Sequence, residues 1–185
     1  MLSGKVNNRA TMVRISVERY SEMRKIWAPW RMQYIVQAGK GKGCILCDKP
    51  LETKDKDNYI LYRGKYNFII LNAYPYTAGH LMVVPYRHIG NVTEANTKEA
   101  AEHISLMQLC VGLLTAEITP DGFNLGMNLG KVAGAGLEGH IHTHIVPRWN
   151  GDHNFMPVVA ETRVISEGLE ATYEKLKEGL SRLSQ

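Results

Sequence analysis

The chain has 185 residues, of which 44% are hydrophobic and 22% charged, and its formal net charge is +4. This composition fits one globular domain with a single core and excludes a wholly disordered protein. The mild positive charge is compatible with anionic small molecules but too small for a nucleic-acid-binding surface, so we expect no nucleic-acid partner.

The sequence also bears on location. It contains no run of roughly 18 apolar residues, so we expect no membrane-spanning helix and no membrane partner. Residues 1–20 are polar and basic without the apolar stretch of a signal peptide. We therefore expect residues 1–23 to be a flexible extension and residues 24–185 to form the domain. Three cysteines, an odd number, argue against a disulfide framework and favour the cytoplasm.

The first half of the chain predicts a docking segment followed by strands. Residues 24–37 mix tryptophans with basic residues and are interrupted by Pro29, which is typical of a segment packed on the domain surface. Three short apolar runs then predict strands, the first two joined as a hairpin by the turn "RGKY". The predicted strands are residues 58–63, 67–72 and 80–88.

The second half predicts a long helix, further strands and a final helix. Ile104, Met107, Val111 and Leu114 repeat at a spacing of three and four, which indicates one apolar helix face between residues 97 and 118. Pro120 and Gly122 end that helix. The remaining predicted elements are strands at 122–130, 139–149 and 157–165, and a helix over 167–183. This order indicates an α+β fold with a mainly antiparallel sheet.

The stretch "GHIHTHIVPRW" places His140, His142 and His144 at alternate positions. In a strand, residues two apart share a face, so the three imidazoles would line one side while Ile141, Thr143 and Ile145 point to the other. They could be ordinary polar residues on a solvated face. A single metal ion bound by all three is excluded, because the outer two α-carbons lie roughly 13 Å apart on a regular strand.

The remaining interpretation of the three histidines is a division of labour in catalysis. The central imidazole would attack a phosphorus atom, and the flanking two would orient it or assist the leaving group. An imidazole is largely uncharged near neutral pH and so has a lone pair for attack. Its other ring nitrogen must donate to a fixed acceptor, which sets the tautomer.

The motif "HIHTHIV" resembles the triad pattern of the histidine triad (HIT) superfamily, with Thr143 at a position that is usually apolar. "TAGHLMVVPYRHIGNVTE" and "NLGMNLGKVAGAG" are also similar to segments of that superfamily. "IWAPWRMQYI", "GCILC" and "PRWNGDHNFMP" resemble the branch related to diadenosine tetraphosphate phosphorylases. The similarity covers roughly residues 24–165.

The resemblance implies a fold and an activity. The fold is a five-stranded, mainly antiparallel sheet with a long helix and a C-terminal helix, which dimerises into a continuous ten-stranded sheet. The activity is nucleotidyl transfer or hydrolysis at the α-phosphate of a dinucleoside polyphosphate or related nucleotide, without an organic cofactor. Alternatives are a non-catalytic nucleotide-binding regulatory protein, a nucleoside phosphoramidate hydrolase, and a zinc hydrolase that uses metal-bound water.

The resemblance also implies roles for single residues. His142 would be the nucleophile, His144 would contact the phosphate and the departing oxygen, and His140 would lie beside His142 and support its orientation. Substrate binding would involve a further set of positions. These are Asn72, which would bind the ribose hydroxyls, Asn128, which would contact phosphate, His80, and Trp149, which could equally be a core or dimer-contact residue.

The loop before the triad departs from the family pattern. Many members carry a Gln-Ser or Gln-Thr pair there, whereas this chain has Gly136 and Leu137 and no hydroxyl group. Successive backbone N–H groups of this glycine-rich loop could bind phosphate instead.

The spacing of Cys44 and Cys47 is that of a zinc half-site, although two cysteines in an apolar stretch can also be plain core residues. The resemblance supplies the other two ligands, His88 and His140, and so implies structural zinc. Four protein ligands would leave no position for a reactive water. The other histidines, His103 and His153, are predicted to lie on the surface, and Cys110 in the core.

Overall fold

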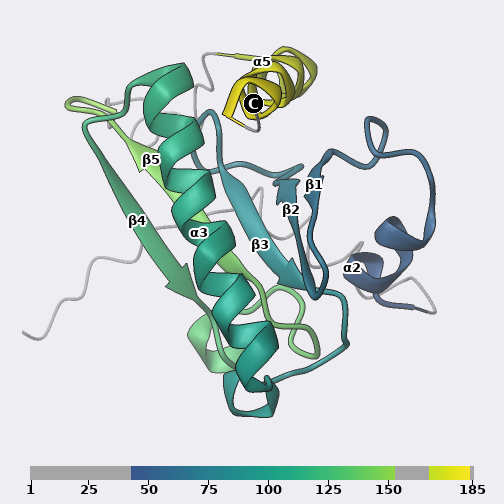
Figure 1. Ribbon diagram of the computed structural model, residues 1–185. Helices are drawn as coiled ribbons and strands as arrows, with labels where there is room; N and C mark the ends of the chain where they lie inside the picture. Colours follow the sequence, from purple (N-terminus) through teal and green to yellow (C-terminus); the bar gives the residue numbers. More distant parts are fainter. Residues whose placement is uncertain (1–42, 153–166, 184–185) are drawn as a thin grey trace, which may run out of the picture.

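The computed structural model describes residues 43–152 and 167–183. A five-stranded sheet with strand order β1-β2-β3-β5-β4 forms its centre, and all neighbouring strands are antiparallel. The long helix α3 crosses one face of this sheet, and α5 lies beside one end of α3 (Figure 1). The strands are β1 (Ile60–Arg63), β2 (Asn67–Leu71), β3 (Leu81–Pro85), β4 (Gly122–Met127) and β5 (Thr143–Arg148).

The helices are few and unequal in length. The one-turn α2 (Ile45–Asp48) packs beside β1 and β2, α3 runs over Thr97–Ile118, and α5 runs over Leu169–Leu183. Short 3₁₀ turns lie at Lys49–Leu51, Val92–Glu94 and Lys131–Ala133. The predicted α+β class, the hairpin and the long helix are confirmed. The strand predicted over 157–165 and the docking segment 24–37 lie outside the described residues.

Alternation along the strands divides the core between the two faces of the sheet. Ile69, Leu71 and Val83 join the core under α3, whereas their neighbours Phe68 and Val84 join a second cluster on the opposite face. Because both faces are covered, all five residues of β2 and of β3 are buried. Strand β3, which pairs directly with β5, and β2 behind it are therefore rigid supports for what β5 carries.

The start of α3 is fixed by a capping box. The side chain of Asn96 accepts hydrogen bonds from the backbone N–H groups of Lys98 and Glu99, and the Glu99 carboxylate accepts the N–H of Asn96. The helix ends where Thr119 takes a left-handed conformation with φ +44°. The predicted bounds of 97 and 118 are thus confirmed.

The predicted apolar face of α3 is correct at Leu114, which is fully buried, and wrong at Ile104. Ile104 is 54% exposed, and Met107 and Val111 are only partly buried. The stripe that α3 buries in the core shares only Leu114 with the predicted one and consists of Leu106, Cys110, Leu113 and Leu114. Apolar residues surround enough of this helix that the spacing alone does not single out one stripe, and the buried Cys110 confirms the prediction made for it.

Candidate functional site

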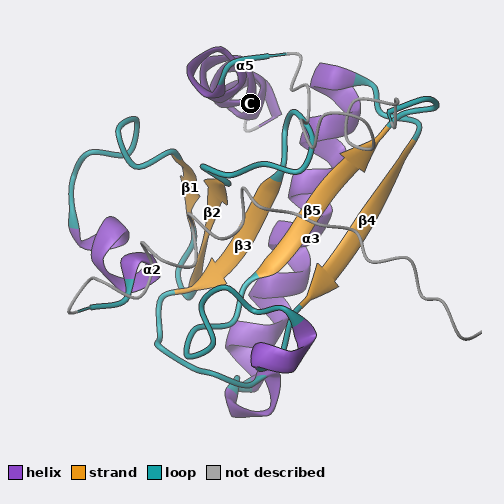
Figure 2. Ribbon diagram, turned by 180° about the vertical axis from the view of Figure 1, so that it is seen from behind, coloured by secondary structure: helices purple, strands orange, loops and turns teal. Residues whose placement is uncertain are grey.

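The triad histidines lie at the start of β5, on the sheet face opposite α3 (Figure 2 shows this face of the sheet). Only His144 lies within the strand, paired with Met82 of β3 and Gly126 of β4. His140 and His142 precede the strand but keep the same alternation. The rings of His142 and His144 meet edge to face, with centroids 4.8 Å apart. Ile145 and Thr143 point to the other side, as predicted.

The position of His142 fixes its tautomer. Its Nδ1 lies 3.0 Å from the backbone oxygen of His140, and because a carbonyl only accepts, Nδ1 carries the proton. In the described part of the chain no hydrogen bond takes up Nε2, which then holds the lone pair. The ring is only 7% exposed, and this burial lowers the pKa of His142. The imidazole is therefore held neutral, with one nitrogen available for attack.

His144 is oriented by the fully buried His80. Nε2 of His80 lies 2.9 Å from Nδ1 of His144. Nδ1 of His80 receives the backbone N–H of Tyr76 at 3.1 Å and faces Nδ2 of Asn72 at 3.3 Å, so it is an acceptor. The proton of His80 consequently sits on Nε2 and points to His144. A neutral His144 then carries its own proton on Nε2.

The ring of His140 faces away from His142 and toward the cysteines. Its Nδ1 lies 3.2 Å from Sγ of Cys44 and 3.3 Å from Sγ of Cys47. Its Nε2 lies 2.8 Å from the backbone oxygen of Pro85, to which it donates. His140 contacts His142 through its backbone carbonyl, which holds the orientation of the His142 ring, and its own ring is turned to the cysteines.

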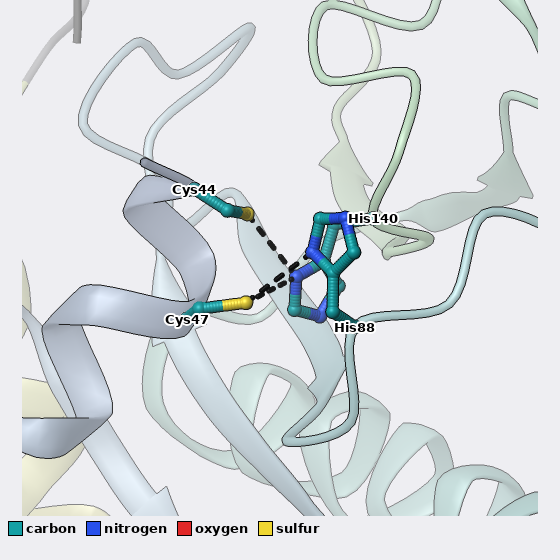
Figure 3. A group of neighbouring side chains, drawn as sticks. All are labelled: Cys44, Cys47, His88 and His140. Carbon is teal, nitrogen blue, oxygen red and sulfur yellow. Dashed lines mark hydrogen bonds between the residues drawn. The ribbon is translucent and has the colours of Figure 1, made fainter. Parts of the chain in front are cut away.

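Cys44, Cys47, His88 and His140 form one cluster whose ligand atoms all lie within 4.8 Å of one another (Figure 3). The two cysteines come from the turn of α2, with Cys44 as its N-cap, and the histidines approach from the opposite side. A tetrahedral zinc ion would separate sulfur and nitrogen ligands by about 3.6 Å, close to the distances found here. The cluster can hold a metal ion.

The chemistry of the four side chains also fits a cation. Burial, the adjacent Cys44 thiol and Asp48 raise the pKa of Cys47, because a second thiolate in this place lacks a compensating charge. His140 donates one N–H to a carbonyl and turns its other nitrogen to the cluster, which is the usual arrangement of a metal-ligating histidine. Gly139 makes room for the ligands, since a Cβ there would lie 3.1 Å from Nε2 of His88.

Comparison with known proteins identifies the family of this chain. Residues 53–151 match the HIT domain family. Over 163 residues the chain is 34% identical to the AP-4-A phosphorylase of Mycobacterium tuberculosis (strain CDC 1551 / Oshkosh), with 84% of each chain covered. This chain belongs to the HIT family.

Two further similarities extend this result. A bis(5'-adenosyl)-triphosphatase of Saccharomyces cerevisiae (strain YJM789) is 29% identical over 91 residues, which cover 49% of this chain and 44% of that enzyme. The crystal structure of a zinc-bound histidine triad family protein from Mycobacterium smegmatis superimposes with a TM-score of 0.61 at 26% identity, covering 77% of this chain and 96% of the other.

The structure of this HIT protein brings several of the predicted substrate-binding residues near the triad. Asn72 contacts His80, as described above, and its Oδ1 accepts the N–H of Tyr74. Asn128 follows β4 and donates to the backbone oxygen of Gly134 at 3.3 Å, which holds the loop before the triad. Trp149 is not brought near the triad: it follows β5 at the end far from His142, is half-buried, and donates its backbone N–H to Asp152.

The loop that contains Gly136 and Leu137 runs from the 3₁₀ turn at Lys131–Ala133 to His140. The side chain of Leu137 packs against the core cluster on the triad face of the sheet. Any contact of this residue with phosphate therefore belongs to its backbone and not to its side chain.

The surface position predicted for His103 is wrong. Its ring is partly buried under the sheet and contacts Asn67 at 2.9 Å and Thr143 at 2.8 Å. The sequence gives no sign of this, because its partners lie 36 and 40 residues away and meet only in the folded sheet. His153 lies outside the described residues.

Proposed function

We propose that this protein transfers a nucleotidyl group from a dinucleoside polyphosphate such as diadenosine tetraphosphate to inorganic phosphate, through a covalent intermediate on His142. The observation that carries the proposal is the orientation of His142, whose Nδ1–H is tied to the His140 carbonyl. This leaves the lone pair of a neutral, mostly buried ring on Nε2. The similarity to a protein described as an AP-4-A phosphorylase supports the choice of substrate and acceptor.

The reaction proceeds in two balanced steps. Nε2 of His142 attacks the α-phosphorus, a bond forms between nitrogen and phosphorus, and the bond from that phosphorus to the bridging oxygen breaks. With diadenosine tetraphosphate the departing group is ATP. An oxygen of inorganic phosphate then attacks the same phosphorus, releases His142 and forms ADP. Positioned donors stabilise the charge on the phosphoryl oxygens in both steps.

His144 serves the departing oxygen in this scheme. Because His80 donates to its Nδ1, the proton of a neutral His144 is on Nε2, where it can hydrogen-bond a phosphoryl or bridging oxygen. His80 acts through His144 and is a positioning residue. His140 contributes to catalysis only through its backbone carbonyl.

The remaining proposed contacts surround the nucleotide. Asn72 would bind the ribose hydroxyls and Asn128 the phosphate, and the backbone N–H groups of Gly136 and Leu137 would add an anion-binding loop. Trp149 would stack on the base or approach the polyphosphate. Each of these roles rests on position in the motif together with the placement of these residues around β5.

We further propose that the cluster of Cys44, Cys47, His88 and His140 binds a structural zinc ion. Its donor set and distances fit tetrahedral zinc, and a structural relative is described as zinc-bound. The ion would compensate the charge of the thiolates and fix the position of the His140 backbone. With four protein ligands it has no site for a reactive water, so the ion takes no part in bond breaking.

The decisive experiment is incubation with diadenosine tetraphosphate, with and without inorganic phosphate, followed by product analysis. ADP plus ATP, formed only with phosphate, is the expected result. AMP plus ATP, or two ADP, would replace phosphorolysis by hydrolysis. If the dinucleotide is untouched but a nucleoside phosphoramidate is cleaved, the site acts on P–N bonds instead. Binding without any turnover would leave a regulatory nucleotide-binding protein.

The nucleophile is tested separately. His142→Ala should abolish turnover and the labelling of the protein by a substrate with radioactive α-phosphorus. Retained turnover would overturn the assignment. A hydrolase that depends on metal-bound water would instead lose all activity in Cys44→Ser while that variant is still folded.

We also propose a homodimer joined at β4. Strand β4 is the last strand in the sheet order, and Leu125 in it is 48% exposed. Pairing of two such edges would give the ten-stranded sheet, which a molar mass of two chains in light scattering would support. Among the described residues no helix is both long and apolar enough for a membrane crossing. The cytoplasmic location stays a prediction.

A further inference from the structure

A hydrogen-bonded network lies on the α3 face of the sheet, directly behind the triad. His103 of α3 places Nε2 2.8 Å from Oγ1 of Thr143 and Nδ1 2.9 Å from Oδ1 of Asn67. Thr143 is 4% exposed and Asn67 is fully buried. The imidazole therefore links β5 to β2 across β3, which lies between those two strands.

The contacts of Asn67 determine which group donates and which accepts in each hydrogen bond of this network. The side-chain N–H groups of Asn67 donate to the backbone oxygen of Glu99 and to the Glu102 carboxylate, both at 3.1 Å. Oδ1 of Asn67 is thus turned to His103 and accepts its Nδ1–H. Burial lowers the pKa of His103, so the ring is neutral and its Nε2 accepts the hydroxyl proton of Thr143.

The network ends on an ionised carboxylate. Glu102 accepts the backbone N–H groups of Lys65, Tyr66 and Asn67 at 2.6–2.7 Å. Burial alone would raise the pKa of Glu102, but the hydrogen bonds from Asn67 and from these N–H groups outweigh it and lower the pKa. The charged Glu102 carboxylate, held by several hydrogen bonds, therefore fixes the position of Asn67 and the direction of the hydrogen bonds that follow.

Thr143 is the residue between His142 and His144, and β5 begins with it. Its backbone pairs with Val83 of β3 and Met127 of β4, and a cavity of about 160 Å³ lies against its side-chain face. The apolar side chains that line the cavity include Met107, Met127 and Ile141. The polar lining residues include His103 and Thr143 of the network. On this incompletely packed face, the hydrogen bond between Thr143 and His103 is a directional contact that fixes the side chain of Thr143.

We propose that His103 is a positioning residue that holds the nucleophile and its neighbour in place by its hydrogen bond to Thr143. This inference rests on the proposed function. The hydroxyl at position 143 departs from the apolar residue of the triad pattern, and His103 is the partner that makes a polar residue fit behind the triad. Displacement of the strand by a fraction of an ångström would misalign His142 and His144 for phosphoryl transfer.

The first test compares Thr143→Val, Thr143→Ser and His103→Ala by steady-state kinetics with diadenosine tetraphosphate and phosphate. We expect kcat to fall about tenfold in Thr143→Val and His103→Ala, while KM stays within about twofold. Thr143→Ser keeps the hydroxyl and should keep kcat within about twofold. Ser105→Ala, which removes an exposed hydroxyl bonded only to its own helix, is the matched control and should be unchanged.

Three results would overturn the proposal: full kcat in Thr143→Val, an equal loss in Thr143→Ser, or a rise in KM without a fall in kcat. Valine has nearly the volume of threonine, so Thr143→Val decides the question if His103→Ala does not fold.

A second measurement does not depend on turnover. The ¹⁵N shifts of the His142 ring should show one tautomer, protonated on Nδ1, in the wild type and in Thr143→Ser. In Thr143→Val they should show a mixture of tautomers, because the ring and its acceptor no longer keep one geometry. Identical spectra in Thr143→Val would refute the positioning role. Absence of turnover in the wild type would instead refute the proposed function while this comparison still stands.

Discussion

Nε2 of His80 lies 2.9 Å from Nδ1 of His144, so a residue that precedes β3 determines where a residue of β5 carries its proton. The ring of Tyr76 packs on both histidines, with centroid distances of 4.6 and 5.7 Å, and its backbone N–H fixes the tautomer of His80. A fourth imidazole, that of His80, thus orients the third histidine of the triad.

His80→Ala is expected to lower kcat by roughly 10- to 100-fold, because His144 loses the donor that directs its proton toward the departing oxygen. The ratio of products formed from diadenosine tetraphosphate should not change, since the nucleophile is intact. Steady-state kinetics with product analysis checks both points. A kcat equal to that of the wild type would show that His144 keeps its tautomer without His80.

Metal content should follow the four-residue cluster. Purified protein is expected to contain one zinc ion per chain, and Cys44→Ser or His88→Ala should lose most of it and melt at a lower temperature. Cys110→Ala is the control: it removes a buried core thiol remote from the cluster and should keep its zinc. Elemental analysis and thermal melts decide this, and zinc-free wild-type protein after growth in zinc-supplemented medium would contradict it.

The ion pair between Arg87 and Glu99 should appear in acid stability. Hydrogen bonds from Arg87 and from the backbone of Asn96 lower the pKa of Glu99 from 4.5 to about 2. Because the folded pKa lies below the unfolded one, the contribution is present above pH 4.5 and is lost as the pH falls toward 2. Glu99→Gln should therefore lower Tm at pH 7 and lose this difference near pH 2.

The ion pair between Arg87 and Glu99 lies beside the metal-binding cluster, because Arg87 directly precedes His88. The control for the melts is Glu178→Gln on the exposed side of α5, which should leave Tm unchanged at either pH. A difference for Glu99→Gln that is the same at pH 7 and pH 2 would exclude the carboxylate charge as its cause.

Gly79 is expected to tolerate no side chain. Its φ is +74°, and a Cβ there would lie 2.6 Å from Cδ1 of Ile118. Gly79→Ala should reduce the free energy of unfolding by about 1–3 kcal/mol, measured by urea titration. Gly112→Ala is the opposite case, because it lies inside α3 with nothing within 4 Å, and should add about 0.5–1 kcal/mol. Equal effects of both would refute this explanation.

The fold was predicted well where turn-forming or helix-breaking residues agree with the spacing of apolar residues. The "RGKY" turn separates β1 from β2, and Pro120 and Gly122 follow the end of α3, so these elements were found with nearly correct bounds. Of the buried stripe of α3 only Leu114 was predicted, because which apolar stripe faces the sheet depends on the angle at which the helix crosses it. Period alone carries no information about that angle.

The candidate site was predictable in its residues but not in its connections. The spacing of Cys44 and Cys47 and the period of the triad named these five residues, and the resemblance to the HIT family supplied the others, among them His88. The role of the His140 carbonyl, the acceptor at Pro85 and the bridge through His103 depend on backbone groups and partners that are far apart in sequence. Such contacts leave no local pattern and become visible only when the strands are in register.

The two edge strands of the sheet, β1 and β4, differ in whether another element covers them. At β1, the hydroxyl of Tyr173 and Nζ of Lys177 donate to the backbone oxygens of Ile60 and Leu61, so α5 covers the margin. Within the described residues β4 has no such cover. A protein with two bare margins could add copies without end and form fibres. With one margin blocked, addition stops after a single partner, and high expression should yield finite particles rather than filaments.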